Sequence, residues 1–346
     1  MLVKYSKRKS PSKKQYPTVI EERCHQFSLD DLKKSTNNFD EHLRIGLTEF
    51  SIAYKGYLKH NGETDYPIAV KRMIHIFNEW KFKKEIELNC QLHHPNLTSF
   101  IGFCDHKYEK ILVYEYMSNG SLYDHLLLRD MESLSWKKRL EICIGAAKGL
   151  HYLHTGAKRA IFHCDIKPQT ILLDKNMVPK LSHLGFSLQG KLPNSKPKPV
   201  EVNMLNGYMA AKYVLTNTFT DKSDVYSFGM VLLQVACTNY KNTIFDKMIM
   251  LDDTYWFSEK SFNPANFLER FPANEIIDPI LMRLIAPQCL EVFMDIMKRC
   301  LNIEPNERPA MGEVEVELEH ALELQEEADC GKSNDDFYLF PSTSST

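Results

Sequence analysis

The sequence lacks the features of a membrane-spanning helix, of a nucleic-acid-binding protein and of a disulfide framework. No apolar run approaches the ~20 residues that a membrane-spanning helix needs. Lys and Arg number 43 against 45 Asp and Glu, so there is no basic excess and we expect no nucleic-acid partner. The nine cysteines form no CxxC pair and are odd in number, which predicts reduced thiols without a zinc site.

The N-terminal segment is the most basic part of the chain. It begins MLVKYSKRKSPSKK and lacks the apolar core of a signal peptide. Two interpretations remain open for residues 1–27: a solvated, disordered tail, or a peripheral contact with an anionic membrane surface. We expect a cytoplasmic protein, and the inner face of the plasma membrane is where such a contact would occur.

Hydrophobic periodicity divides the rest of the chain into a mixed part and a helical part. In residues 28–117, Ser28 is placed to cap a short helix, three strand-like stretches follow (IAYKGYL, DYPIAVKRM, KILVYEYM), and NEWKFKKEIELNCQL has helical spacing. In residues 118–322, segments 134–154, 219–238 and 288–301 have helical spacing, and an acidic, Ser/Thr-rich tail occupies 323–346. The pattern predicts an α+β protein of two lobes, with a cleft at EYMSNG.

Four short motifs follow one another in a characteristic order. IAVK ends in Lys71, FKKEIE contains Glu85, HCDIKPQT contains Asp165, and LSHLG follows with His183. Over roughly residues 40 to 320 these resemble the strand lysine, the helix glutamate, the catalytic loop and the metal-binding turn of eukaryotic protein kinases. The stretches FSLDDLKKSTNNF, GAAKGLHYLH and DKSDVYSFGMVLL are similar to plant receptor-like kinases, in particular those of the FERONIA type.

The resemblance implies a bilobal protein-kinase fold and ATP as the nucleotide. It assigns Asp165 to accept the proton of the substrate hydroxyl and Lys167 to steady the transferred phosphate. The residues that it assigns to nucleotide binding are Gly46, Ala53, Ala69, Lys71, Glu85, Glu115 and Met117.

The chain departs from the family pattern at the metal position. Kinases hold Mg²⁺ with the Asp of the turn and with an Asn five residues after the catalytic Asp, and this chain has His183 and Thr170 there. Mg²⁺ prefers oxygen ligands, whereas imidazole suits zinc, copper or iron. We therefore expect weak or absent Mg²⁺ binding and assign no metal ligands. Cys164 also replaces the Arg that reads a phosphorylated activation loop, so loop phosphorylation is not expected to be the switch.

Two further segments depart from the pattern. In IGLTEFSIAY, Thr48 and Ser51 replace two glycines of the phosphate-covering loop, which should weaken its hold on phosphate. Four positions after Glu85, where the family has an apolar residue, this chain has Asn89. A buried amide without a hydrogen-bond partner there would cost about 1–3 kcal/mol.

The peptide-binding end is altered as well. Leu205, Ala211 and Lys212 replace a Thr, a Pro and a Glu of the family pattern. The lost Glu normally pairs with the residue that is Arg308 here, so we expect this buried Arg to need another partner such as Glu307.

Two functions are compatible with this pattern. The first is a pseudokinase that acts as a signalling adaptor or scaffold and whose partners are receptor kinases or other signalling proteins. The alternative is an active or weakly active serine/threonine kinase that uses ATP. Lys71, Glu85 and Asp165 favour the alternative. The replacements that oppose it are His183, Thr170, Thr48, Ser51 and Lys212.

Overall fold

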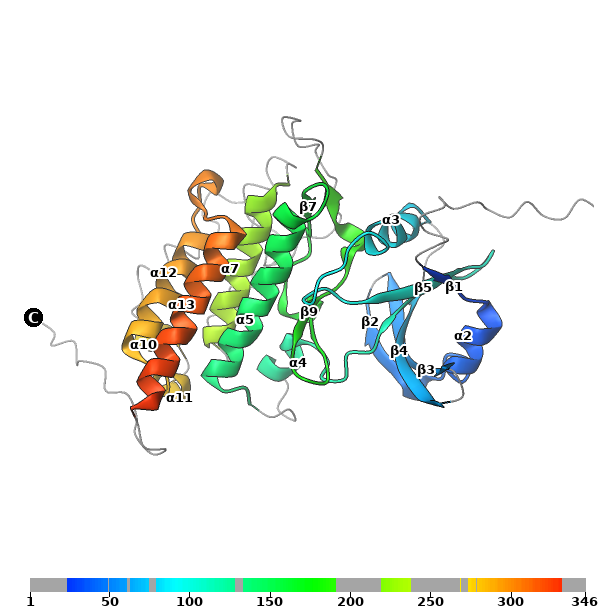
Figure 1. The fold of residues 1–346 in the computed structure, drawn as a ribbon, viewed down its shortest axis with the longest axis horizontal. Helices are drawn as coiled ribbons and strands as arrows, with labels where there is room; N and C mark the ends of the chain where they lie inside the picture. The colour runs from blue at the N-terminus through cyan, green and yellow to red at the C-terminus, as the bar shows by residue number, and fades with distance from the viewer. Residues whose placement is uncertain are drawn as a thin grey trace, which may run out of the picture. The chain divides into compact units, whose positions relative to one another are not determined.

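The computed structural model describes residues 24–48, 50–60, 63–74, 79–127, 133–190, 219–237, 268, 273–277 and 279–331. These residues form two compact units (Figure 1). The first contains the described residues up to Gln91 together with Phe100–Glu115, and the second contains Leu92–Ser99 and the described residues from Tyr116 onward. The first is rich in β-structure and the second in helix, which confirms the predicted α+β fold.

A six-stranded sheet forms the frame of the first unit. Its spatial order is β1-β5-β6-β4-β3-β2. The strands are β1 (His25–Gln26), β2 (Arg44–Leu47), β3 (Ser51–His60), β4 (Glu63–Met73), β5 (Phe100–Asp105) and β6 (Lys110–Glu115). Strand β1 pairs parallel to β5, and the other described pairs are antiparallel. Ile68 and Val70 of β4 are fully buried, because alternate residues of this strand face one side of the sheet.

Two helices accompany this sheet. Helix α2 (Leu29–Ser35) begins at the predicted cap, where the Ser28 hydroxyl accepts a hydrogen bond from the Asp31 N–H at 3.1 Å. Helix α3 (Glu79–Asn89) buries Phe82 and Ile86 completely, four residues apart on one face. Both helices confirm the positions expected from the sequence.

Four longer helices form the core of the second unit. They are α5 (Trp136–His151), α7 (Asp221–Cys237), α12 (Pro287–Cys300) and α13 (Met311–Cys330), and Figure 1 shows them side by side. Leu140, Phe228 and Phe293 are fully buried among them. The three helices expected in 134–154, 219–238 and 288–301 are confirmed.

Short elements complete the second unit. They are the helices α4 (Leu122–Leu127), α10 (Ala273–Ile276) and α11 (Pro279–Met282) and the strands β7 (Ile161–Phe162), β8 (Ile171–Leu173), β9 (Pro179–Leu181) and β10 (Leu188–Gln189). Single helical turns lie at Pro168–Thr170 and Leu184–Phe186. In the part of the chain that the structure describes, no helix is both long and apolar enough to cross a bilayer.

The prediction that all the cysteines are reduced thiols is wrong for two of them. Cys24 and Cys90 form a disulfide, whereas the other seven are free. The two are 66 residues apart in the sequence, and the pairing of β1 with β5 brings the N-terminal segment beside the end of α3. Local cysteine spacing carries no signal for a pair of this kind, because only the tertiary fold places the two residues together.

Candidate functional site

A buried ion pair joins strand β4 to helix α3. The Lys71 ammonium lies 2.8 Å and 3.1 Å from the two carboxylate oxygens of Glu85. The Glu85 side chain is 2% exposed and that of Lys71 is 13% exposed. The two residues that the motifs single out are thus brought together, as the kinase resemblance implies.

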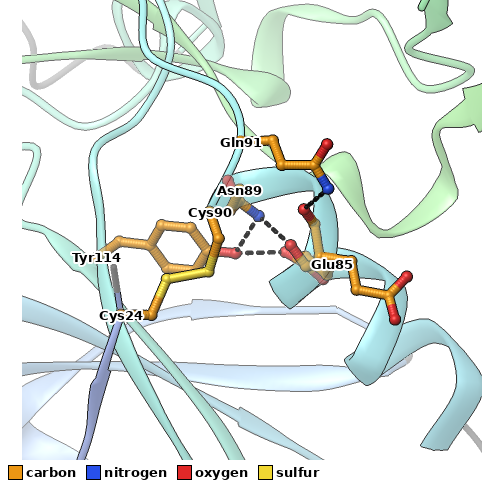
Figure 2. Close-up of a disulfide and its surroundings, with 7 residues drawn as sticks. Cys24, Glu85, Asn89, Cys90, Gln91 and Tyr114 are labelled. Carbon is orange, nitrogen blue, oxygen red and sulfur yellow. Dashed lines mark hydrogen bonds between the residues drawn. A yellow bond between two sulfur atoms is a disulfide. The ribbon is translucent and has the colours of Figure 1, made fainter. Parts of the chain in front are cut away.

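Tyr114 and Asn89 surround the same carboxylate. The Tyr114 hydroxyl of β6 donates to Glu85 at 2.7 Å, and burial, followed by the Glu85 charge, raises the pKa of this hydroxyl well above its usual value. The Asn89 amide donates to the Glu85 carbonyl at 2.7 Å and lies 3.3 Å from the Tyr114 hydroxyl. Figure 2 shows this network beside the disulfide. The buried Asn89 amide is therefore partnered, and the expected cost of an unpaired amide does not arise.

Sequence reasoning did not single out Tyr114. A signal existed, because Tyr114 belongs to a strand-like run that pairs with the lysine strand. The register places Ala69 opposite Tyr114 and Ile68 opposite Glu115. Met117, which follows β6 in the chain, is 7% exposed.

In the loop between β2 and β3, Thr48 and Ser51, which replace glycines of the family pattern, hydrogen-bond to each other. Gly46 pairs with Ala53 in the ladder of this hairpin. Beyond it, the Thr48 hydroxyl accepts the Ser51 N–H at 3.0 Å and the Phe50 N–H at 3.3 Å, and lies 2.9 Å from the Ser51 hydroxyl. In kinases a glycine-rich loop covers the phosphates at this place. Here the Thr48 hydroxyl accepts hydrogen bonds from two backbone N–H groups of the loop.

The Asp165 carboxylate lies close to the side chains of Lys167 and His183. Its carboxylate oxygens are 2.7 Å from the Lys167 ammonium and 3.6 Å from the His183 Nδ1. Burial by itself would raise the pKa of Asp165, but His183 and Lys167 hold it below its usual value. Asp165 is therefore an ionised, 9% exposed carboxylate at neutral pH.

The Thr170 hydroxyl is occupied by the backbone of its own loop. It lies 2.7 Å from the Asp165 carbonyl and 3.0 Å from the Lys167 carbonyl, and it accepts the Lys167 N–H at 3.2 Å. The residue is 1% exposed. Its oxygen is therefore engaged in holding the catalytic loop.

The donors at this place do not fit a magnesium ion. Mg²⁺ requires near-octahedral oxygen ligands at about 2.0–2.1 Å. Asp165 is paired with Lys167, Thr170 is bonded to backbone, and His183 offers nitrogen. Among the described ranges there is no group of three or more His, Cys, Asp or Glu that could hold a metal ion.

The backbone around Asp165 is held by the buried carboxylate of Asp224 on α7. Asp224 accepts the His163 N–H at 2.7 Å, the Cys164 N–H at 2.9 Å and a bond from the His154 ring at 2.9 Å. Cys164 and His183 both have left-handed backbones, with φ of 67° and 70°. Such values are uncommon for residues other than glycine, so the surrounding bonds must stabilise them.

His163 is a structural residue of the catalytic-loop segment. It is 0% exposed, and burial lowers the pKa of its ring, which is therefore neutral. Its Nδ1 accepts the Asp165 N–H at 3.2 Å, so its Nε2 donates to the Ser182 carbonyl at 2.8 Å. The ring thus links the catalytic loop to the residue before His183.

Arg308 has partners other than the expected acid. Its guanidinium donates to the carbonyls of Asn302 at 2.7 Å and Lys222 at 2.8 Å, and it lies over the Tyr226 ring at 4.9 Å. Burial lowers the pKa of Arg308. The replaced residues Leu205, Ala211 and Lys212 lie outside the described residues.

Comparisons with known proteins agree with this geometry. Residues 39–318 match the model of the protein tyrosine and serine/threonine kinase family. The receptor-like protein kinase ANXUR2 of Arabidopsis thaliana is 41% identical over 310 residues, which cover 88% of this chain and 35% of the relative. The receptor-like protein kinase FERONIA of the same plant is 38% identical over 310 residues, which cover 88% of this chain and 33% of the relative.

The chain thus spans about a third of the length of these relatives. The match to the family model covers most of the sequence and includes both the Lys71–Glu85 pair and the Asp165 loop. On this basis the chain belongs to the protein tyrosine and serine/threonine kinase family.

Proposed function

We propose that this kinase domain is a pseudokinase that acts in signalling through protein contacts and transfers phosphate poorly or not at all. The observation that carries the proposal is the set of donors around Asp165. The imidazole of His183 and the backbone-bonded hydroxyl of Thr170 stand where kinases have the Asp and Asn that hold Mg²⁺, and the nearby carboxylate of Asp165 is paired with Lys167. Loss of one preorganised charge-stabilising group typically costs ~10²–10³ in rate.

The loop of Thr48 and Ser51 supports the same proposal. A nucleotide phosphate would have to compete with the Thr48 hydroxyl for the N–H groups of Phe50 and Ser51. The side chains at these two positions also limit how closely a phosphate can approach the backbone. We therefore expect nucleotide to bind weakly and without a requirement for metal.

A second candidate function is a weakly active, ATP-dependent serine/threonine kinase. The intact Lys71–Glu85 pair favours it, because this pair holds the α- and β-phosphates in kinases. The ionised Asp165 also favours it, since an acceptor for the hydroxyl proton must be deprotonated. The residues proposed to contact ATP remain Gly46, Ala53, Ala69, Lys71, Glu85, Glu115 and Met117.

Thermal-shift titration with ATP, with and without Mg²⁺ or Mn²⁺, separates the two functions. For the wild type we expect no metal-dependent rise in melting temperature. The double variant His183→Asp/Thr170→Asn restores both missing oxygen ligands, and we expect it to gain one. Phosphotransfer by the wild type that disappears in Asp165→Asn would overturn the pseudokinase proposal and establish the second function.

The proposed partners follow from the relatives, whose names describe receptor-like kinases. We propose that other receptor kinases or signalling proteins bind this domain, in the cytoplasm or at the inner face of the plasma membrane. The basic N-terminal segment would supply the contact with anionic lipid. Co-sedimentation with phosphatidylserine vesicles, before and after removal of residues 1–20, tests the membrane contact.

A further inference from the structure

The disulfide between Cys24 and Cys90 ties the N-terminal segment to the helix that carries Glu85. The two Cα atoms are 6.4 Å apart, and the residues are 7% and 2% exposed. Both belong to a buried cluster with Phe82, Ile86 and Phe103, so the bond lies inside the core of the first unit. Figure 2 shows it next to Asn89 and Tyr114.

We propose that Cys24 and Cys90 form a reversible redox-modification site, with a peroxide as the oxidant and a dithiol as the reductant. In the forward direction, one thiolate attacks hydrogen peroxide, forms an S–O bond, breaks the O–O bond and releases water. The second thiol then displaces water from this sulfenic acid and forms the S–S bond. The net reaction consumes two thiols and one H₂O₂ and yields one disulfide and two waters. In reverse, a reducing dithiol attacks the bond through a mixed disulfide.

Access to the buried sulfurs comes from the short strand that follows Cys24. Strand β1 has two residues, paired with Gly102 and Phe103 at the edge of the sheet, and the next residue, Phe27, donates its N–H to the Phe103 carbonyl at 2.8 Å. Local opening of so few backbone pairs is far less costly than unfolding the sheet. Reagents can therefore reach both sulfurs when β1 separates from β5.

The pair differs from the other cysteines in its geometry, because its two sulfurs lie together beside the short strand β1, whereas the others are free thiols and mostly buried. Burial raises the pKa of Cys143, Cys237 and Cys300 to about 12, so these thiols stay protonated and react slowly. Burial raises the pKa of Cys104 to about 11 as well. Cys330 is the exposed thiol and is the natural competitor for the oxidant.

The redox state of Cys24 and Cys90 also affects how firmly the end of α3 is held against the sheet. The Cys90 N–H donates to the Ile86 carbonyl at 3.0 Å, so Cys90 continues the last turn of the helix, one turn beyond Glu85. Asn89, directly before it, bonds the Glu85 carbonyl and the Tyr114 hydroxyl. The oxidised pair therefore holds the end of α3 against the sheet, where Glu85 meets Lys71. Reduction frees β1 and loosens this end of the helix.

Peroxide titration of the prereduced 346-residue chain tests the proposal. Thiols are alkylated after each step and the peptides are analysed by mass spectrometry. We expect a peptide in which Cys24 is linked to Cys90, which returns to free thiols with dithiothreitol under native conditions. The linked peptide should be absent in Cys90→Ser and in Cys24→Ser and unchanged in Cys104→Ser, which removes a free buried thiol of β5. Oxidation confined to Cys330 or Cys164, or a linked peptide that resists native reduction, would overturn the proposal.

Hydrogen exchange measures the structural consequence. On reduction of the wild type, we expect the amides of residues 25–27 and 86–91 to exchange at least tenfold faster, while those of α12 do not change. In Cys90→Ser and Cys24→Ser the faster rates should be present already and insensitive to reductant. Equal exchange of the oxidised and reduced wild type at these amides would show that the pair does not control α3.

Discussion

Removal of Lys71 leaves a buried carboxylate without its cation. Loss of one partner of a buried ion pair typically costs about 3–5 kcal/mol. Tyr114 still donates to Glu85 at 2.7 Å, and a hydrogen bond to a charged group contributes about 1.5–3 kcal/mol, so the lower end applies. We expect Lys71→Met to lower the free energy of unfolding by about 3 kcal/mol at pH 7.

Removal of Glu85 has a smaller effect, because the two sides of the pair differ in exposure. The Lys71 side chain is 13% exposed and flexible, so it can turn its ammonium toward water, whereas the Glu85 side chain is 2% exposed. We therefore expect Glu85→Gln to cost about 1–2 kcal/mol. The double variant Lys71→Met/Glu85→Gln leaves no buried charge, and it should be more stable than Lys71→Met alone.

Urea denaturation of the four proteins, followed by circular dichroism, completes this double-mutant cycle. A Lys71→Met variant within about 0.5 kcal/mol of the wild type would contradict the cost assigned to the buried carboxylate. So would a double variant that is less stable than Lys71→Met. Because Lys71→Met is expected to be less stable, any ATP titration of this variant should be made at a temperature where it is still folded.

Three further predictions concern other positions. Thr170→Val removes the hydroxyl that bonds three backbone groups and should lower the free energy of unfolding by about 1–3 kcal/mol, measured with urea. Thr170→Ser keeps a hydroxyl and should lower it less. Equal losses of stability in the two variants would contradict this role. Burial holds the pKa of His163 in the folded protein below its unfolded value of about 6.5. The contribution of the neutral ring to the free energy of unfolding is therefore fully present above pH 6.5 and is lost as the pH falls toward the folded pKa. The loss is at most about 1.4 kcal/mol per pH unit. Urea unfolding between pH 7.5 and 5 should show this slope, and His163→Gln should flatten it. Gly102→Ala places a Cβ against the His25 carbonyl and should accelerate hydrogen exchange at residues 25–27; unchanged protection would contradict the close approach of β1.

The sequence predicted the elements whose signal is local or repeated. The helix start at Ser28 depends on one side chain and the next turn, and the long helices repeat buried residues every three or four positions. The pairing of Lys71 with Glu85 could be predicted from the order of the family motifs, although the two residues lie 14 positions apart in the sequence. These features require no knowledge of contacts between distant segments.

The features that escaped prediction depend on such contacts. The disulfide results from β1 pairing with β5, and a two-residue strand has too short a pattern to be recognised. Asn89 was expected to be a buried amide without a partner, but it bonds the Glu85 carbonyl of its own helix, and Tyr114 reaches it from a strand 25 residues away. Arg308 likewise finds carbonyl groups and a ring that no spacing in the sequence indicates.

The position of Asp224 has a consequence for how this chain could lose catalytic residues during evolution. Its carboxylate binds the catalytic loop through main-chain N–H groups of residues 163 and 164, which every amino acid except proline supplies. This anchor of the loop therefore does not depend on the side chain at position 164. If the domain is the pseudokinase proposed above, the change from Arg to Cys164 would thus have removed a functional side chain and left this anchor of the loop in place.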